Sequence, residues 1–315
     1  MGNVLLITNK DDITTDFVVK RLRTKGAPFY RLNTEEITES VSVTLNLAEE
    51  EGYIYDEILS RLYKLSDFDA VYFRRPQIKE YVDNELNDGE RDFLRREMIY
   101  LLEGIYKMLQ HANWLNTVDN IRIAENKIFQ QIMAKKIGFT MAESIITTRY
   151  EDFKNFVVRQ KSIIKPIKSG QIGDKIVYTS DVKTITAKEQ VENYPNYLQK
   201  KIDKAFDIRV TVVGEKVFAV RIDSQQRQET ATDWRKGENL LPHCKAQLPI
   251  DVEQKCIDLI KELHLGFGAI DLIEDKDGKY VFLEINPNGN WAWIEKQTGY
   301  DISGEIVKRL VNGQM

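Results

Sequence analysis

The sequence has few cysteines and histidines and no long apolar run, and each shortage excludes a class of protein. Only Cys244 and Cys256 are cysteines among 315 residues. Their spacing fits no metal site, so we expect two reduced thiols in a cytoplasmic protein. The three histidines, His111, His243 and His264, are isolated, which indicates no histidine-based catalytic or metal cluster. No segment approaches the roughly 18–20 consecutive apolar residues that a membrane-spanning helix requires.

The charges are balanced and evenly spread. Lys and Arg number 45 against 49 Asp and Glu, which gives a net charge of −4 and a pI near 5.7. A general nucleic-acid-binding protein should carry a basic surface, so this composition argues against one. The amino terminus also lacks the charged and then apolar layout of a signal peptide. At 315 residues, the chain can form one large domain or two to three small ones.

Short apolar runs alternate with helical patterns in the first part of the chain. Residues 4–8 and 70–73 are apolar almost throughout, which is typical of strands buried in a parallel sheet. Residues 11–25 favour a helix and residues 29–33 favour the next strand. This strand–helix–strand order predicts an open, Rossmann-like α/β domain over residues 1–118.

Two further units are expected, a central lid over residues 119–196 and a carboxy-terminal domain over residues 197–315. Residues 120–136 have the periodicity of one helix, and residues 162–167 favour a strand. The carboxy-terminal domain should contain antiparallel strands and end in a β-hairpin. The expected fold class is therefore α/β.

Three polar residues interrupt the apolar ladder of that hairpin. Glu284 and Asn286 are two apart on one strand, so their side chains face the same side. Asp271 lies on the other strand, across a turn of Asp and Gly residues. Carboxylate and amide oxygens on rigid strands suit Mg²⁺, which usually carries nucleotide phosphates as well. The alternative is an ordinary hairpin with acidic residues on its solvated face.

Two lysines are candidates for phosphate binding. Lys165 ends an apolar strand just before a loop that contains Gly170 and Gly173, and Lys127 begins a helix. A lysine in such a place can act as a point charge on phosphate, with backbone N–H groups of the loop around it. The glycines are too few for a Walker or Rossmann motif, and either lysine alone could be a surface residue.

Several arginines and acids occur in pairs two residues apart. Asp207 and Arg209 form one such pair and Arg221 and Asp223 the other, and we expect both pairs to face one cleft. Arg235 follows in a polar loop, where a guanidinium can clamp phosphate with two hydrogen bonds. Surface ion pairing is the alternative for each arginine.

The order of these motifs resembles the ATP-grasp superfamily of carboxylate–amine ligases. It is similar in particular to the ribosomal-protein glutamate ligases, and closer still to the microviridin-type peptide macrocyclases, or graspetide synthetases. The narrower resemblance depends on residues 12–22 and 30–33, on residues 71–76, and on residues 283–295. The resemblance covers nearly the whole chain. It implies an ATP-grasp fold in which ATP lies between the central lid and the carboxy-terminal antiparallel sheet.

The resemblance also implies a role for each matching residue. Lys127 and Lys165 would bind phosphates, Asp207 would contact ribose, and Arg235 would stabilise the transferring phosphoryl group. Asp271, Glu284 and Asn286 would hold two Mg²⁺ ions. The adenine would be held by Gln199 and by the backbone of Lys200, Lys201 and Ile202. The chain departs from the pattern at Lys200, where many relatives have a glutamate.

The function implied is ATP-dependent ligation. An Asp or Glu side chain of a ribosomally made precursor peptide with a leader segment would become an acylphosphate. A Ser or Thr hydroxyl or a Lys amine would then close an ester or amide macrocycle. Because such a peptide is acidic, Arg74, Arg75, Arg209 and Arg221 are candidates to seat it. Neither nucleic acid nor membrane is an expected partner. The sequence leaves open whether the protein forms a homodimer.

Two other functions stay open. One is a ligase that adds free amino acids, such as glutamate, to a protein or peptide. The other is a nucleotide-gated binding protein without catalysis. The combination of the three metal-type residues with Lys165 and Arg235 disfavours the latter, because a protein that only binds nucleotide needs no phosphoryl clamp.

Overall fold

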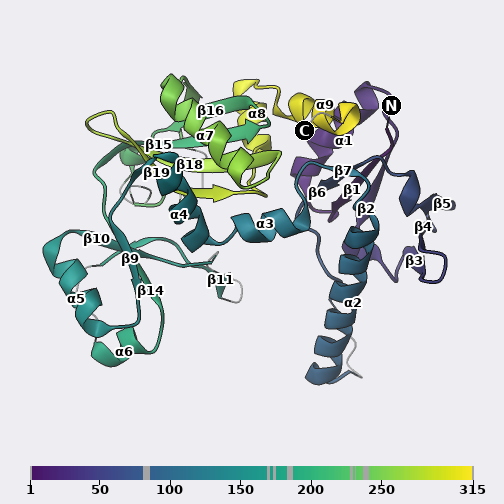
Figure 1. Cartoon of the computed structure of the whole chain (residues 1–315), viewed down its shortest axis with the longest axis horizontal. Coiled ribbons are helices and arrows are strands. Elements are labelled where there is room, and N and C mark those ends of the chain that lie inside the picture. The colour runs from purple at the N-terminus through teal and green to yellow at the C-terminus, as the bar shows by residue number, and fades with distance from the viewer. Residues whose placement is uncertain are drawn as a thin grey trace. The chain divides into compact units, whose positions relative to one another are not determined.

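The computed structural model describes residues 2–80, 86–168, 171–172, 175–182, 187–227, 230, 232–236 and 241–313. The chain divides into two compact units. Unit 1 comprises Met1–Ile121, Leu265–Phe267 and Asn290–Met315, and unit 2 comprises Arg122–His264 and Gly268–Gly289. Helices and strands are mixed in both units (Figure 1), so the expected α/β class is confirmed. In the described ranges, no helix combines the length and the apolar character needed to cross a membrane.

Unit 1 is built on a four-stranded parallel sheet in the order β2-β1-β6-β7. All five residues of β1 are buried, as the apolar run predicts for a central parallel strand. A three-stranded antiparallel sheet, β3-β4-β5, is inserted between β2 and β6. The elements of unit 1 are β1 (Val4–Thr8), α1 (Ile13–Thr24), β2 (Phe29–Asn33), β3 (Val41–Asn46), β4 (Glu51–Asp56), β5 (Arg61–Lys64), β6 (Ala70–Phe73), α2 (Asp88–Met108), β7 (Asn113–Trp114), α8 (Ala292–Thr298) and α9 (Ile302–Asn312).

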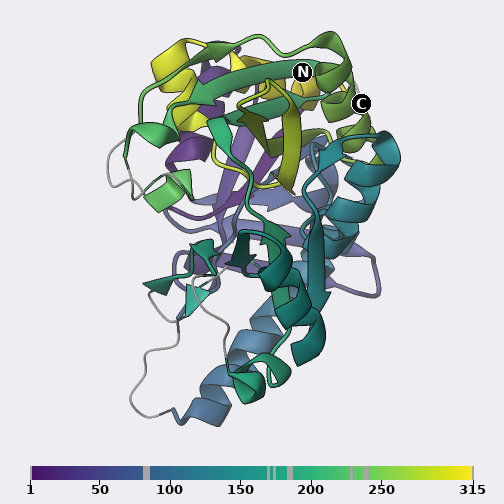
Figure 2. The ribbon, with the colours of Figure 1, turned by 90° about the vertical axis from the view of Figure 1, so that its left-hand side faces the viewer.

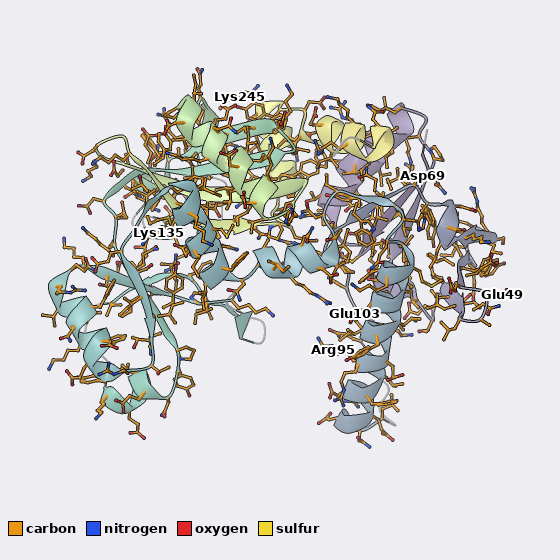
Figure 3. The ribbon with its side chains drawn as sticks, viewed as in Figure 1. Glu49, Asp69, Arg95, Glu103, Lys135 and Lys245 are labelled. Carbon is orange, nitrogen blue, oxygen red and sulfur yellow. The ribbon has the colours of Figure 1, made fainter. Side chains whose placement is uncertain are left out.

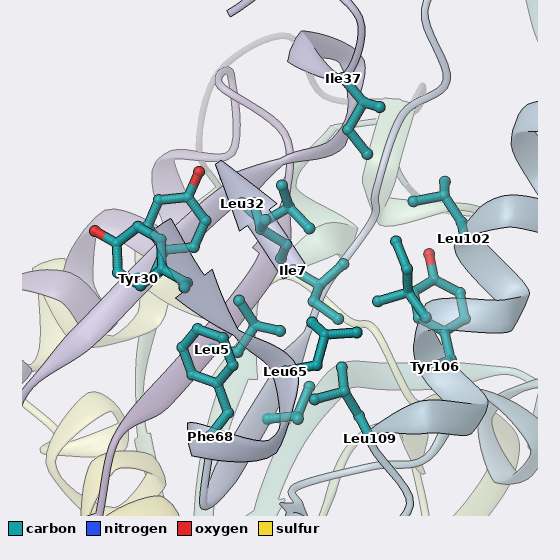
Figure 4. Close-up of a cluster of buried hydrophobic side chains, with 14 of the residues drawn as sticks. Leu5, Ile7, Tyr30, Leu32, Ile37, Leu65, Phe68, Leu102, Tyr106 and Leu109 are labelled. Atoms are coloured by element: carbon teal, nitrogen blue, oxygen red, sulfur yellow. The ribbon is translucent and has the colours of Figure 1, made fainter. Parts of the chain in front are cut away.

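A hydrophobic core of unit 1 lies where the two sheets meet α2. Figure 4 shows Leu5 and Ile7 of β1 packed in this core with Leu102 and Tyr106 of α2. The amino-terminal half of α2 buries no residue before Met98, and it extends away from the parallel sheet of this unit (Figures 1 and 2). Figure 3 labels two charged residues of α2, the exposed Arg95 and the half-buried Glu103.

Unit 2 contains a six-stranded sheet in the order β17-β16-β15-β18-β19-β8 and a smaller sheet in the order β13-β10-β14-β9. Helix α7 lies along the six-stranded sheet (Figure 1), and α5 and α6 pack on the smaller sheet through Phe153, Phe156, Val191 and Leu198. The elements are α4 (Lys127–Ile137), β8 (Thr140–Met141), β9 (Ser144–Thr147), α5 (Tyr150–Arg159), β10 (Ser162–Lys165), β11 (Gln171–Ile172), β12 (Lys175–Ile176), β13 (Ser180–Asp181), α6 (Lys188–Glu192), β14 (Asn196–Lys200), β15 (Lys204–Val213), β16 (Lys216–Ile222), β17 (His243–Ala246), α7 (Ile250–Glu262), β18 (Phe267–Asp275) and β19 (Tyr280–Asn286).

The single helix expected over residues 120–136 is two helices. α3 (Val118–Ala124) ends before Asn126, and α4 begins after it. The side chain of Asn126 accepts hydrogen bonds from the N–H groups of Ile128 and Phe129, so it caps α4. Gly138 ends α4 with φ of 94°, a left-handed conformation that glycine adopts without strain. The apolar period continues across the break, which is why the sequence pattern did not reveal it.

Candidate active site

The hairpin of β18 and β19 brings together the three predicted metal ligands. Asp271 lies directly opposite Glu284, and Ala269 lies opposite Asn286, so all three polar side chains share one face. The register shifts between Asp271 and Leu272, which leaves Leu283 as an extra residue on β19. Such a β-bulge re-aims the side chains beside it and is frequent next to functional sites.

Basic side chains of unit 2 form ion pairs with the carboxylates of Glu284 and Asp271. Lys127 Nζ lies 3.0 Å from Glu284 Oε2, and Arg235 Nη1 lies 3.5 Å from Glu284 Oε1. Arg209 Nη1 donates to both oxygens of Asp271 at 2.9 Å. Gly289 packs closely against this face, because a Cβ there would lie 2.3 Å from the Cβ of Ala269 and 2.8 Å from Arg209 Nη2.

The surroundings move the two carboxyl pKa values in opposite directions. Burial raises the pKa of Asp271, and the charge of Arg209 offsets this only in part. Burial would also raise the pKa of Glu284, but the charges of Lys127, Arg235 and Lys165 outweigh it and lower that pKa. Glu284 therefore holds its negative charge more strongly than Asp271 does, which suits a metal ligand.

The donor set fits Mg²⁺. Two carboxylates and an amide are hard oxygen donors, and Mg²⁺ usually completes its shell with phosphate oxygens and water. Within the described part of the chain, no three His, Cys, Asp or Glu side chains cluster as a metal site. The amide of Asn286 is therefore needed. Its Oδ1 accepts a hydrogen bond from the N–H of Asn288 at 2.9 Å and keeps a second lone pair.

Lys165 is the last residue of β10, next to β14, and its pKa is shifted from the ordinary value of a lysine. Its Nζ donates to Gln199 Oε1 at 3.1 Å and lies 4.6 Å from the centroid of the Tyr197 ring. Burial lowers its pKa to about 8. The charge of Glu284 opposes this shift, and that of Lys127 adds to it.

Nucleotide affinity should therefore fall as the pH rises through about 8, because only the protonated form of Lys165 attracts phosphate. The expected result is a Kd for ATP that increases between about pH 7 and about pH 9. Lys165→Arg should flatten this dependence, because a guanidinium stays charged. Titration of the protein with ATP across this range measures it, and a constant wild-type Kd would contradict the prediction.

Gln199 has an unused donor that suits a nucleotide base. The side chain is 1% exposed, and its Nε2 has no hydrogen-bond partner in the described structure. A buried donor without a partner is costly, so a ligand acceptor such as adenine explains it. The N–H groups of Lys200 and Lys201 are already donated to the carbonyls of Glu143 and Lys161. These two residues can therefore contact a base only through other groups.

Asp207 is enclosed by protein partners. Its Oδ2 lies 2.6 Å from Lys204 Nζ and also accepts the hydroxyl of Ser224. The residue is 3% exposed, and burial raises its pKa against the charge of Lys204. Contact with ribose would require Asp207 to exchange one of these partners.

Arg235 follows Asp233 on a short 3₁₀ turn, where the two side chains form a bidentate pair. Nε and Nη2 of Arg235 donate to the two oxygens of Asp233, each at 2.9 Å. Burial would lower the pKa of Arg235, but the bonds and charge of Asp233 raise it. The remaining Nη1 points at Glu284. Asp233 thus orients a guanidinium toward the metal-type residues, a role that the sequence interpretation missed.

The expectation that both arginine pairs face one cleft is wrong. Arg209 lies opposite Val220, and Arg221 lies opposite Ile208, so the two arginines occupy opposite faces of the sheet. Asp271 pairs with Arg209 on one face, whereas the guanidinium of Arg221 lies 4.3 Å from the Phe206 ring centroid on the other. A spacing of two fixes the face within each strand but not the register between strands.

Arg221→Glu is therefore expected to leave ATP-dependent turnover within about threefold of the wild type, the range of an exposed interaction. The reason is that its side chain does not share a face with Asp271. Steady-state ADP release measures this, with Arg209→Glu as the matched charge reversal that should abolish turnover. Equal losses in both variants would contradict the assignment of faces.

Arg74 and Trp291 have their contacts within unit 1. Arg74, in unit 1, is 2% exposed and pairs with Asp12 at 3.0 Å, so it does not offer a charge to a peptide. Trp291 is fully buried with its ring edge-on to that of Phe17, so it is a packing residue. Gly170 and Gly173 of the predicted phosphate loop lie outside the described residues.

Two domain families match the chain. Residues 124–310 match the RimK-like ATP-grasp domain, which is more than half of the chain. Residues 3–122 match the MvdD pre-ATP grasp domain.

Solved structures resemble the whole chain. A RiPP-associated ATP-grasp ligase from Chryseobacterium gregarium, in complex with ADP and a leader and core peptide, is 28% identical with a TM-score of 0.92. The match covers 100% of this chain and 98% of that one. The macrocyclase MdnC from Microcystis aeruginosa MRC, bound with precursor peptide MdnA, is 25% identical with a TM-score of 0.88 over 100% of both chains.

A glutamate ligase is among the sequence relatives. The tetrahydromethanopterin:alpha-L-glutamate ligase of Methanocaldococcus jannaschii is 23% identical over 221 residues. This match covers 66% of the chain and 73% of the ligase.

Proposed function

We propose, because this chain belongs to the RimK-like ATP-grasp family, that it is an ADP-forming ligase that closes macrocycles in a ribosomally made peptide. ATP-grasp ligases use ATP and Mg²⁺. The substrate would be an acidic precursor peptide with a leader segment. Its Asp or Glu carboxylates would be joined to Ser or Thr hydroxyls or to Lys amines.

One observation carries this proposal. The similarity to the RiPP-associated ligase and to MdnC extends over the full chain, including unit 1, and both of those structures contain a peptide. The glutamate ligase, by contrast, matches 66% of the chain at 23% identity. The peptide-modifying ligases are therefore the better guide to the substrate.

The chemistry begins with the carboxylate of the peptide. A carboxylate oxygen attacks the terminal phosphorus of ATP, so an acylphosphate forms and ADP leaves. The hydroxyl or amine of the same peptide then attacks the carbonyl carbon. Inorganic phosphate leaves with the bonding pair, and the proton of the nucleophile passes to solvent or phosphate. Each round of these two steps makes one ester or amide bond.

The residues on one face of unit 2 would stabilise the transferring group. Lys127, Lys165 and Arg235 would donate to phosphate oxygens, because preformed cations lower the barrier most where charge develops. Asp271, Glu284 and Asn286 would hold Mg²⁺, which supplies further charge neutralisation. Lys127 of α4 and the metal-type residues of the hairpin already lie together, which supports these phosphate and metal roles.

Nucleotide and peptide would contact other residues. Gln199, with the segment from Lys200 to Ile202, would contact adenine, and Asp207 would contact ribose after exchanging a partner. Arg209 is the stronger candidate to seat the reacting carboxylate. Its guanidinium lies on the Asp271 face and would be released when a metal ion takes that carboxylate.

The division of the chain into domains at 118/119 and 196/197 also stays a proposal. It would place β10, which carries Lys165, in a segment that can close over nucleotide, whereas Gln199 of β14 would belong to the carboxy-terminal domain. The protein is expected to act in the cytoplasm, where ATP is available.

A second candidate function is addition of free glutamate to a protein or peptide, which the glutamate-ligase relatives favour. A nucleotide-gated binding protein is the candidate without catalysis.

Mass spectrometry distinguishes these three functions. The protein is incubated with ATP, Mg²⁺ and short acidic peptides rich in Ser and Thr as candidate substrates, with and without free glutamate.

Macrocyclisation should remove one water from the peptide mass for each bond formed, with one ADP released per bond. Addition of glutamate would increase the mass instead and would need free glutamate. An unchanged peptide mass without ADP release would refute both ligase functions.

A further inference from the structure

One face of α4 meets the edge of β19 that carries the metal-type residues. Lys127, Gln130 and Gln131 are spaced i, i+3 and i+4, so they lie on neighbouring turns of the same face. Lys127 reaches the carboxylate of Glu284. The two glutamines reach the backbone on either side of that residue.

Gln130 takes the place of a strand neighbour for Ile285. Its Nε2 donates to Ile285 O at 2.7 Å, and its Oε1 accepts from Ile285 N at 3.2 Å. The same Nε2 donates to Ala124 O at 2.6 Å. The side chain is 2% exposed, so both halves of the amide are used inside the protein. An amide oriented in this way satisfies both edge groups of one residue, as a paired strand would.

Gln131 holds the bulge itself. Its Nε2 donates to the carbonyl of Leu283, the extra residue of β19, at 2.7 Å. Strand β8 pairs with β19 only at Val281 and Phe282, so its register ends just before the bulge. Beyond the end of β8, the side-chain amides of Gln130 and Gln131 therefore supply the hydrogen bonds that a neighbouring strand would give to β19.

Stability alone does not account for Gln131. Its Oε1 is buried and has no hydrogen-bond partner among the described atoms, which is a cost to folding. Natural proteins retain such costs mainly where another requirement outweighs stability.

We propose that Gln130 and Gln131 are positioning residues that fix the bulge of β19 and thereby aim Glu284 and Asn286 at Mg²⁺ bound with a nucleoside triphosphate. This inference rests on the proposed function. Mg²⁺ demands near-ideal octahedral geometry, so its ligands must be held to within about 0.5 Å. The two glutamines hold the backbone of β19 at Leu283 and Ile285, on either side of Glu284. The bulge then sets the direction of the Glu284 side chain relative to Asp271.

The test is the Mg²⁺ dependence of nucleotide binding. A fluorescent ATP analogue is titrated at a series of Mg²⁺ concentrations, without peptide. Gln131→Leu should raise the Mg²⁺ concentration needed for half-maximal binding by about tenfold or more, as losses of metal-supporting contacts do. Gln254→Leu is the matched control. Gln254 is an exposed helical glutamine of α7 whose Nε2 bonds only locally, to Asp258, so this variant should bind as the wild type does.

Urea unfolding of the same variants separates positioning from general destabilisation. Gln131→Leu should unfold at nearly the same urea concentration as Gln254→Leu while its Mg²⁺ dependence shifts. Gln130→Glu is the second variant. It keeps an acceptor for Ile285 N and loses the donor to Ile285 O, so it should shift the Mg²⁺ dependence in the same direction.

The outcomes are distinct. If the wild type binds nucleotide with Mg²⁺ and both variants keep its Mg²⁺ dependence, the positioning role is refuted and the proposed function stands. The positioning role is also refuted if the variants bind less nucleotide by the same factor at every Mg²⁺ concentration and this loss follows their loss of stability in urea. If the wild type itself binds no nucleotide with Mg²⁺, the proposed function fails.

Discussion

Replacing Glu284 with glutamine is expected to abolish ATP-dependent turnover while the protein stays folded. Glu284 is the carboxylate whose pKa is lowered by three surrounding cations, so it is ionised and able to bind a metal ion. Glutamine keeps the size of the side chain and removes its charge. Lys127 and Arg235 would then face each other across a neutral group, and Mg²⁺ would lose its strongest ligand.

The same ion pairs predict that Mg²⁺ binds weakly without nucleotide. Lys127 and Arg235 already neutralise Glu284, and Arg209 neutralises Asp271. A metal ion must displace these cations. Phosphate oxygens offer Lys127 and Arg235 an alternative partner, so nucleotide and metal should bind together.

Release of ADP and loss of water from the peptide measure the effect of Glu284→Gln. Glu274→Gln is the matched control, because it makes the same change on the same hairpin at a residue that contacts Tyr280. Thermal unfolding should be similar for the two variants. Normal product formation by Glu284→Gln would remove Glu284 from the metal site.

The parts of the site that follow from local spacing could be predicted from the sequence. Glu284 and Asn286 share a face because strand side chains alternate, and the turn brings Asp271 across from them. The parallel sheet of unit 1 followed from apolar runs such as that of β1. These features depend on residues close together in the chain.

The parts that depend on register or on distant partners could not be predicted. Arg209 and Arg221 each sit in a correct strand, but only the pairing of β15 with β16 decides that they face opposite sides. Gln130 bonds to Ile285, 155 residues away, and a glutamine on a helix gives no sign of such a partner. The break at Asn126 was hidden because the apolar period runs through it.

Removal of Lys165 or Arg235 is expected to reduce turnover by about 10²–10³ each, the usual effect of losing one donor to a developing charge. Arg235 Nη1 lies 3.5 Å from Glu284 Oε1, and the charge of Lys165 also lowers the pKa of this carboxylate. Asp233 holds Arg235 by two hydrogen bonds, so this guanidinium is preorganised and little order must be gained during the reaction. Lys165 is half-buried, so its charge is screened by water less than that of an exposed lysine.

The measurement is kcat at saturating ATP for Lys165→Ala and Arg235→Ala. Lys245→Ala is the charge-matched control, because Lys245 is an exposed residue of β17 (Figure 3). Asp233→Asn should give an intermediate loss, since it weakens the orientation of Arg235 and leaves the guanidinium in place. If both alanine variants lost less than about threefold, they would behave as surface ion pairs do, and the phosphoryl clamp would have to lie elsewhere.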